Sequence, residues 1–170
     1  MLTEKLQVAL NGQLNRELYS AYLYLSMNAY FKSVNLDGFA NWMQVQAQEE
    51  LTHAMKFYGF INQRGGRVTL GAVEAPKIDW ANPISVFQDT LTHEKGVTES
   101  INQLMDLALA EKDHATTIFL QWFVTEQVEE EENVGAVLEQ LRRLDGNQNG
   151  LFMLDRDLAT RQFTPAPVAG

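Results

Sequence analysis

Four long segments of the sequence repeat apolar residues at alternating spacings of three and four. This spacing marks the buried face of an α-helix, and in helices of this length it is typical of near-parallel packing in a bundle. The chain is therefore predicted to be all-α, with four long helices around one core.

Recognisable starts and stops delimit these helices. Each start is a side chain that can accept a hydrogen bond from the free N–H groups of a first helical turn. The four starts are Thr3, Asp37, Asn82 and Asp113. Pro83 suits the first turn of the third helix. The first helix is expected to end near Ser33, and the second at the two glycines after Arg64.

The connections predict the topology. A few residues join helices one and two, and a few join three and four, so each pair is antiparallel. Between the pairs, residues 66–82 have no helical period. At ~3.3 Å per residue this segment can span the ~40 Å of such a helix, so it is expected to cross the whole bundle. A short amphipathic piece from Leu151 to about Thr160 lies in a final helix assigned to about residues 147–160. With the tail 161–170 it completes a single domain.

Composition restricts the function. The chain has no cysteine, which removes disulfides, thiol nucleophiles and Cys-based metal sites, so a metal must be held by oxygen and imidazole. A formal charge of −9 argues against nucleic-acid partners, which require clustered Lys and Arg. The N-terminus lacks a basic region and the most apolar stretch is interrupted by serines. We therefore expect a cytoplasmic protein with no membrane association.

A carboxylate stands near the middle of each helical stripe where an aliphatic residue would be expected. The four are Glu17, Glu50, Glu94 and Glu130. One such glutamate could snorkel to solvent, but four facing one core must be protonated or share cations. His53 lies one turn after Glu50, and Glu-x-x-His is a di-metal ligand pattern in bundles. Two divalent ions balance four carboxylates, and these ligands suit iron or manganese, although zinc would also bind.

The chain resembles ferritins over nearly its whole length, in the motifs RELYSAYLYLSM, QEELTHAMKF and LQWFVTEQVEEEE and in the spaced Glu94. The resemblance implies a ferritin-like four-helix bundle with a long crossover between helices two and three and a short fifth helix. It also implies a ferroxidase that oxidises Fe(II) with O2 or H2O2 and stores ferric mineral in a homo-oligomeric cage of twenty-four subunits. Glu17, Glu50 and His53 would hold the first iron, with Glu50 bridging to a second iron held by Glu94 and Glu130.

Further roles also follow from the resemblance. Gln127 would lie beside the second iron. Tyr24 would lie beside the centre and bond a ligand or supply an electron, with a plain core aromatic as the alternative. Glu49, Glu126 and Glu129 match a third iron site towards the cavity in prokaryotic ferritins. From spacing alone, a solvated acidic helix face is the alternative for these three.

Two departures define the type of ferritin. Haem-containing bacterioferritins and rubrerythrins repeat Glu-x-x-His on the fourth helix, whereas here the pair is Gln127 and Glu130. The second site is therefore expected to hold iron loosely. Leu51 stands where bacterioferritins carry a methionine haem ligand, so no haem is expected. A di-iron peroxidase or oxidase of the rubrerythrin-like class remains the alternative, and a DNA-protecting mini-cage is disfavoured because the chain has no basic tail.

Assembly into a cage is supported indirectly. Apolar residues expected to point outward exceed the needs of one core and indicate subunit contacts. They include Leu14, Leu18, Tyr22, Trp122 and the apolar side of the final helix. His93 and His114 are assigned no role.

Overall fold

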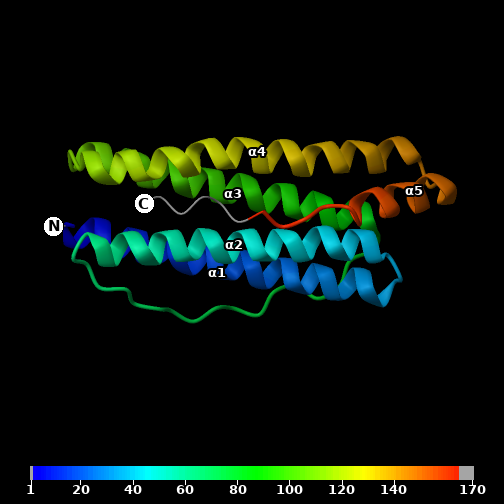
Figure 1. The fold of residues 1–170 in the computed structure, drawn as a ribbon, viewed down its shortest axis with the longest axis horizontal. Coiled ribbons are helices and arrows are strands. Elements are labelled where there is room, and N and C mark those ends of the chain that lie inside the picture. The colour runs from blue at the N-terminus through cyan, green and yellow to red at the C-terminus, as the bar shows by residue number, and fades with distance from the viewer. Residues whose placement is uncertain (1, 165–170) are drawn as a thin grey trace.

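The structure, a computed structural model, describes residues 2–164 and contains five helices in that range. They are α1 (Glu4–Ser33), α2 (Asp37–Gln63), α3 (Pro83–Ala110), α4 (His114–Leu144) and α5 (Gln148–Leu158). The α1–α2 hairpin packs beside the α3–α4 hairpin with all four long axes nearly aligned (Figure 1). The predicted all-α bundle with a short fifth helix is confirmed. No helix in the described range is long and apolar enough to cross a membrane.

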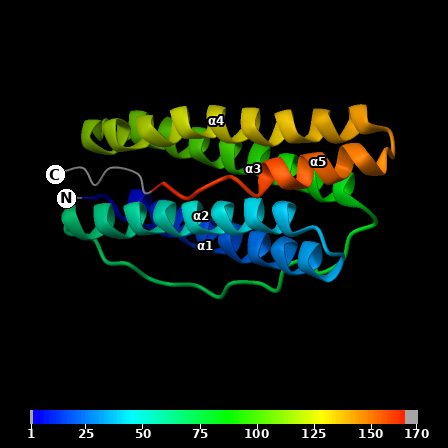
Figure 2. The same ribbon diagram turned by 45° about the vertical axis from the view of Figure 1, so that its right-hand side comes forward.

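The crossover between α2 and α3 runs the length of the bundle, as predicted (Figure 1, Figure 2). It lies along α1, whose polar side chains bind its backbone carbonyls. The Asn11 amide donates to the carbonyl of Arg67 at 3.0 Å, and the Ser26 hydroxyl donates to that of Lys77 at 2.7 Å. Trp80 is buried near the end of the segment. The crossover is therefore fixed to the bundle at several points.

Three of the four predicted N-caps are confirmed. The Thr3 hydroxyl accepts a hydrogen bond from the backbone N–H of Leu6, and the Asp113 carboxylate accepts one from that of Thr116 at 3.0 Å. Asn82 forms a reciprocal capping box with Ser85. These interactions satisfy N–H groups that a first turn leaves without partners. Local sequence was sufficient to predict them because each acceptor lies three residues from its donor.

The start of α2 differs from the prediction. Asp37 is the first helical residue and not the cap, and the cap position, Leu36, supplies no side-chain hydrogen bond. The carboxylate of Asp155 on α5 instead accepts from the N–H groups of Gly38 at 2.8 Å and Phe39 at 3.0 Å. Its negative charge also suits the positive end of the helix dipole. The α2 cap therefore comes from a distant part of the chain.

Helix α5 packs tightly against this end of α2. It begins at Gln148 and ends at Leu158, close to the predicted bounds of about 147–160. A Cβ on Gly38 would lie 1.6 Å from the backbone oxygen of Asp155, so only glycine permits the approach. Leu154 is the buried residue of α5. The segment after α5 then continues in the same direction along α2 (Figure 2).

Two apolar clusters fill the core on either side of a polar band at mid-length. One contains Phe31 stacked on Phe39 at 5.1 Å between ring centroids, and the other contains Phe57 and Phe123 at 4.3 Å. Leu14 belongs to the second cluster, so its expected outward position was wrong. The clusters exclude water from both sides of the polar band.

Candidate metal centre

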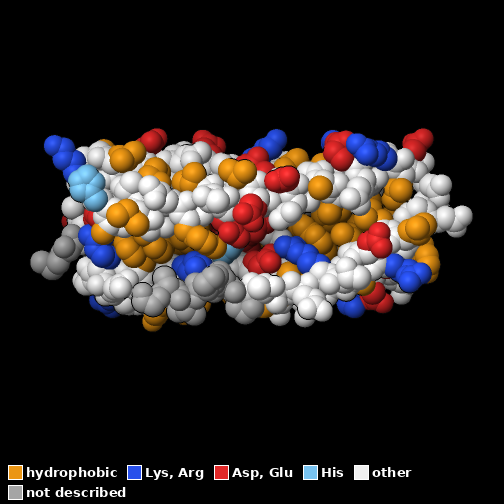
Figure 3. Space-filling view, turned by 45° about the horizontal axis from the view of Figure 1, so that its top comes forward, with side chains coloured by type: hydrophobic (Ala, Val, Ile, Leu, Met, Phe, Trp, Pro, Cys, Tyr) orange, Lys and Arg blue, Asp and Glu red, His pale blue; other side chains and the backbone are white. Residues whose placement is uncertain are grey.

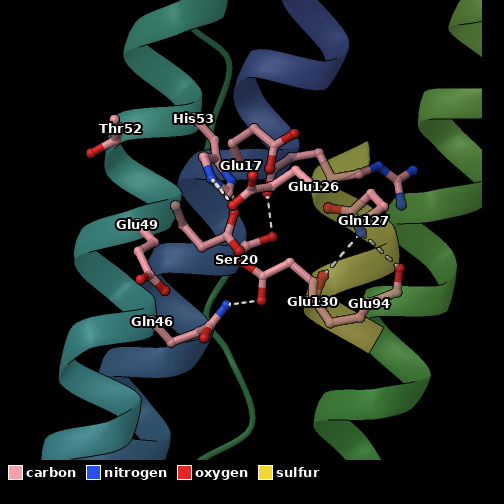
Figure 4. A network of polar contacts seen from close by, with 12 residues as sticks. Glu17, Ser20, Gln46, Glu49, Thr52, His53, Glu94, Glu126, Gln127 and Glu130 are labelled. Atoms are coloured by element: carbon pink, nitrogen blue, oxygen red, sulfur yellow. Dashed lines mark hydrogen bonds and ion pairs between the residues drawn. The ribbon is translucent and has the colours of Figure 1, made fainter. Parts of the chain in front are cut away.

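All four glutamates singled out from the sequence are buried in the polar band. The exposed fractions of Glu17, Glu50, Glu94 and Glu130 are 1%, 2%, 0% and 3%. Each comes from a different helix of the bundle, because each occupies a core position on its own helical stripe (Figure 4). Burial at this level excludes the solvated position that a lone glutamate would prefer. The four helices therefore bring four carboxylates to one level of the core.

Glu17, Glu50 and His53 form one group with metal-ligand geometry. Each offers a ligand atom, and these atoms lie within 4.8 Å of one another. The Glu50 Oε2 atom is 3.3 Å from the Nδ1 atom of His53. The Gln13 amide donates to Glu17 Oε1 at 2.7 Å, while the buried Glu17 Oε2 has no hydrogen-bond partner. A buried oxygen with unused lone pairs fits a cation ligand.

A second group contains His53, Glu126 and Glu130, again within 4.8 Å. The Nε2 atom of His53 is 3.8 Å from Glu126 Oε1. Glu130 Oε2 accepts a hydrogen bond from the Gln46 amide at 2.6 Å. His53 therefore faces both groups through its two ring nitrogens. Glu126, which the sequence associates with a third site, thus faces the same histidine as Glu50.

Glu94 belongs to neither group and is instead held by two polar neighbours. The Tyr24 hydroxyl donates a short hydrogen bond to Glu94 Oε1, and the Gln127 amide donates to Glu94 Oε2 at 3.2 Å. Gln127 also donates to the hydroxyl of Thr98 at 3.3 Å. Tyr24 and Gln127 are both buried. The structure thus places both residues beside the centre and gives each a contact with the same carboxylate.

Burial raises the pKa values of all four glutamates. The pKa values of Glu17 and Glu50 lie well above the ordinary range, mainly through burial and then through neighbouring carboxylates. Burial, followed by repulsion from Glu94, raises the pKa of Glu130 to about 8. The pKa of Glu94 is also raised by burial, although its bonds to Tyr24 and Gln127 oppose the shift. Without cations, burial therefore favours the protonated forms of these side chains.

The three residues assigned to a third site are separated in their contacts. Glu49 is paired with Arg161, with Nη2 and Oε2 2.6 Å apart, while Glu126 faces His53 and Glu129 is exposed. Burial raises the pKa of Glu49, and Arg161 opposes this. Figure 3 shows acidic side chains gathered near mid-length, with a basic side chain beside them. The described residues therefore form an acidic face here without a single three-carboxylate ligand group.

Several polar residues around the centre were not assigned from the sequence. Gln13 and Gln46 were visible as polar positions on apolar stripes, each one turn before a glutamate. Thr98 and Arg161 gave no signal. His93, left without a role, is 2.7 Å from the Ser20 hydroxyl, and burial lowers its pKa to about 4. The lowered pKa favours the neutral imidazole, which packs against the ring of Tyr24.

Comparison with known families gives one match over most of the chain. Residues 7–144 match the family described as "Ferritin-like domain". The chain is 40% identical over 163 residues to a bacterial non-heme ferritin of Staphylococcus epidermidis, covering 96% of this chain and 98% of that protein. A Staphylococcus aureus protein of the same name has the same 40% identity and the same coverage of both chains.

Solved structures agree with these relatives. A closed form of the Archaeoglobus fulgidus ferritin, engineered by mutagenesis, superposes with a TM-score of 0.96 at 51% identity, covering 96% of this chain and all of that one. The open-pore ferritin of the same archaeon superposes with a TM-score of 0.95 at 51% identity, covering 95% of this chain and all of that one. The likeness in sequence and fold includes all five helices described above.

Proposed function

This chain belongs to the ferritin family of iron-storage proteins, and we propose that it is a haem-free ferroxidase that oxidises Fe(II) and deposits ferric iron in a homo-oligomeric cage. One observation carries the proposal. Four carboxylates and one imidazole converge in a buried polar band between two apolar clusters, and one carboxylate oxygen there has no hydrogen-bond partner. Iron is the substrate, and O2 or H2O2 is the oxidant.

The first iron position is the better defined of the two. Glu17, Glu50 and His53 supply oxygen and nitrogen ligands that are already close together. Gln13 fixes one oxygen of Glu17 and thereby directs the other into the centre. Loss of protons from the glutamates gives the negative charge that two divalent ions require.

The second position is proposed to use Glu50, Glu94 and Glu130, with Gln127 beside it. In the described structure, Glu94 is engaged by Tyr24 and Gln127, so iron binding here requires that Glu94 exchange one of these hydrogen bonds for the metal. The amide of Gln127 is a weaker ligand than an imidazole. We therefore infer that iron leaves this position readily, as storage requires.

The acidic face beside the centre is the proposed route to the cavity. Glu126 lies between His53 and the surface, and Glu49 and Glu129 extend the negative charge outward. Divalent and trivalent cations are attracted along such a face because its charges are partly shielded from solvent. We propose a cytoplasmic cage of twenty-four subunits as the assembly.

Native mass before and after iron loading tests storage and assembly together. Aerobic addition of Fe(II) to the purified protein should yield a soluble oligomer that holds far more than two irons per chain. Iron that stays at about two per chain, on a monomer or dimer, would overturn storage. Turnover of an organic substrate by such a species would instead favour a di-iron peroxidase or oxidase.

Replacement of Glu17 and Glu50 by alanine tests the centre itself. The double variant should lose rapid Fe(II) oxidation, measured as the initial rise in ferric absorbance, but keep its fold because removal of buried carboxylates relieves repulsion. The matched control replaces two exposed glutamates, Glu99 and Glu132, and should oxidise iron like the wild type. Equal initial rates in both double variants would refute the site.

A further inference from the structure

Arg161, just after α5, lies against α2 at the edge of the centre. Its guanidinium donates to Glu49 Oε2 at 2.6 Å and to the side-chain oxygen of Gln46 at 2.9 Å. It also lies 4.4 Å from the ring centroid of Trp42 and donates to the carbonyl of that residue at 3.3 Å. A planar guanidinium suits this combination of a carboxylate, an amide and an aromatic face, which lysine would not match.

Gln46 connects this arginine to the metal centre. Its amide oxygen accepts from Arg161, while its amide nitrogen donates to Glu130 Oε2 at 2.6 Å. Gln46 is fully buried, so both bonds fix its orientation. The position of a proposed iron ligand therefore depends, through one side chain, on a residue of the C-terminal segment.

The backbone around Arg161 is held by a second anchor. The Asn41 amide donates to the carbonyls of Leu158 at 3.2 Å and Arg161 at 3.0 Å. These bonds join α2 to the last residue of α5 and to the segment that follows it, so the bond to Arg161 forms only when that segment is docked. The guanidinium contacts and the Asn41 contacts are thus made or lost together.

We propose that Arg161 is a cation latch: its guanidinium occupies the Glu49 carboxylate in the metal-free protein, and a divalent cation that binds Glu49 displaces it and releases the segment after α5. The latch rests on the proposed function, because it takes the cation to be iron on its way between the centre and the cavity. It adds a residue that controls this passage and a movement that accompanies it.

The strength of the ion pair suits a reversible latch. The side chains of Arg161 and Glu49 are 21% and 23% exposed, so water screens the pair in part and its net contribution is modest. A divalent ion carries twice the charge of guanidinium and competes for the same oxygen. Displacement also removes the Arg161 bond from Gln46, which loosens the hold of Gln46 on Glu130 at the moment when a metal has arrived.

Calorimetric titration with Zn2+, which is not oxidised, tests the competition. Arg161→Gln should tighten the weaker class of Zn2+ sites by about three- to tenfold, since the tethered competitor is absent. Binding at Glu17, Glu50 and His53 should not change. The matched control is Arg156→Gln, which removes the same charge from an exposed position on α5 and should leave both classes as in the wild type.

Hydrogen exchange tests the movement, which a merely structural arginine would not produce. In the wild type, Zn2+ should accelerate amide exchange in residues 159–164, whereas in Arg161→Gln exchange there should be fast with or without Zn2+. An unchanged affinity in the variant, or an unchanged exchange rate in the wild type, overturns the latch. Zn2+ bound at the centre with neither effect refutes the latch alone, and absence of all Zn2+ binding refutes the proposed function as well.

Discussion

Glu130 should make the metal-free protein less stable as the pH rises. In the folded state the pKa of this carboxyl is about 8, raised from 4.5 mainly by burial. Between these two values the folded protein keeps the proton, whereas the unfolded chain releases it. Unfolding is therefore favoured as the pH rises through this window, and the stability present below pH 4.5 is lost towards pH 8.

The expected loss is large on the scale of protein stability. One pKa unit corresponds to about 1.4 kcal/mol, so the shift of Glu130 amounts to about 5 kcal/mol. Typical domains have a total free energy of unfolding of about 5–15 kcal/mol. The pKa values of Glu17, Glu50 and Glu94 are raised as well, so these residues add to the loss of stability with rising pH.

Glu130→Gln isolates this effect. The amide cannot ionise, but its oxygen still accepts from Gln46, so the shape and one hydrogen bond persist. Denaturant unfolding of chelator-treated protein, at one subunit concentration, should show the variant several kcal/mol more stable than the wild type at pH 8 and within about 1 kcal/mol at pH 5. The exposed Glu132→Gln should follow the wild type at both pH values. An equal pH slope in wild type and Glu130→Gln would refute the reasoning.

Two further substitutions test packing and metal retention. Gly38→Ala places a Cβ against the Asp155 backbone, so α5 should undock with loss of about 1–2 kcal/mol from the α2 cap, seen as faster amide exchange in residues 148–158. The control is Gly59→Ala, whose Cβ meets nothing within 4 Å and which should stabilise the folded protein by roughly 0.5–1 kcal/mol. Equal effects on stability at both glycines would contradict the role of Gly38. Gln127→Glu adds a carboxylate beside Glu94, so two Zn2+ per chain should survive dialysis that removes the second ion from the wild type. Loss at the wild-type rate would show that Gln127 does not set retention.

The fold was predictable where its causes are local. Three N-caps bind within their own first turn, and helical periodicity located all four long helices. The α2 cap was not predictable, since its acceptor, Asp155, is far away in sequence and reaches α2 only because residue 38 has no side chain. Neither the distant acceptor nor the need for glycine at position 38 can be recognised from the sequence of α2 alone.

The residues of the site also fall into those that local sequence could locate and those that it could not. A carboxylate on an apolar stripe is visible in sequence, so the four glutamates and His53 could be located. Their partners could not, because spacing predicts only neighbours on one helix. Gln46 lies one turn before Glu50 but bonds to Glu130 across the bundle, and its other partner is Arg161 of the C-terminal segment.

Under the proposed function, burial of the glutamates would let one site both attract iron and release it. The desolvation that raises the pKa of Glu130 to about 8 means that incoming Fe(II) must displace protons at neutral pH. Affinity therefore rises with pH and is lower at neutral pH than four ionised carboxylates would give. The two apolar clusters offset the free-energy cost of this arrangement without contributing ligands. A centre whose charge appears only when metal replaces protons is suited to passing iron onward and not to keeping it.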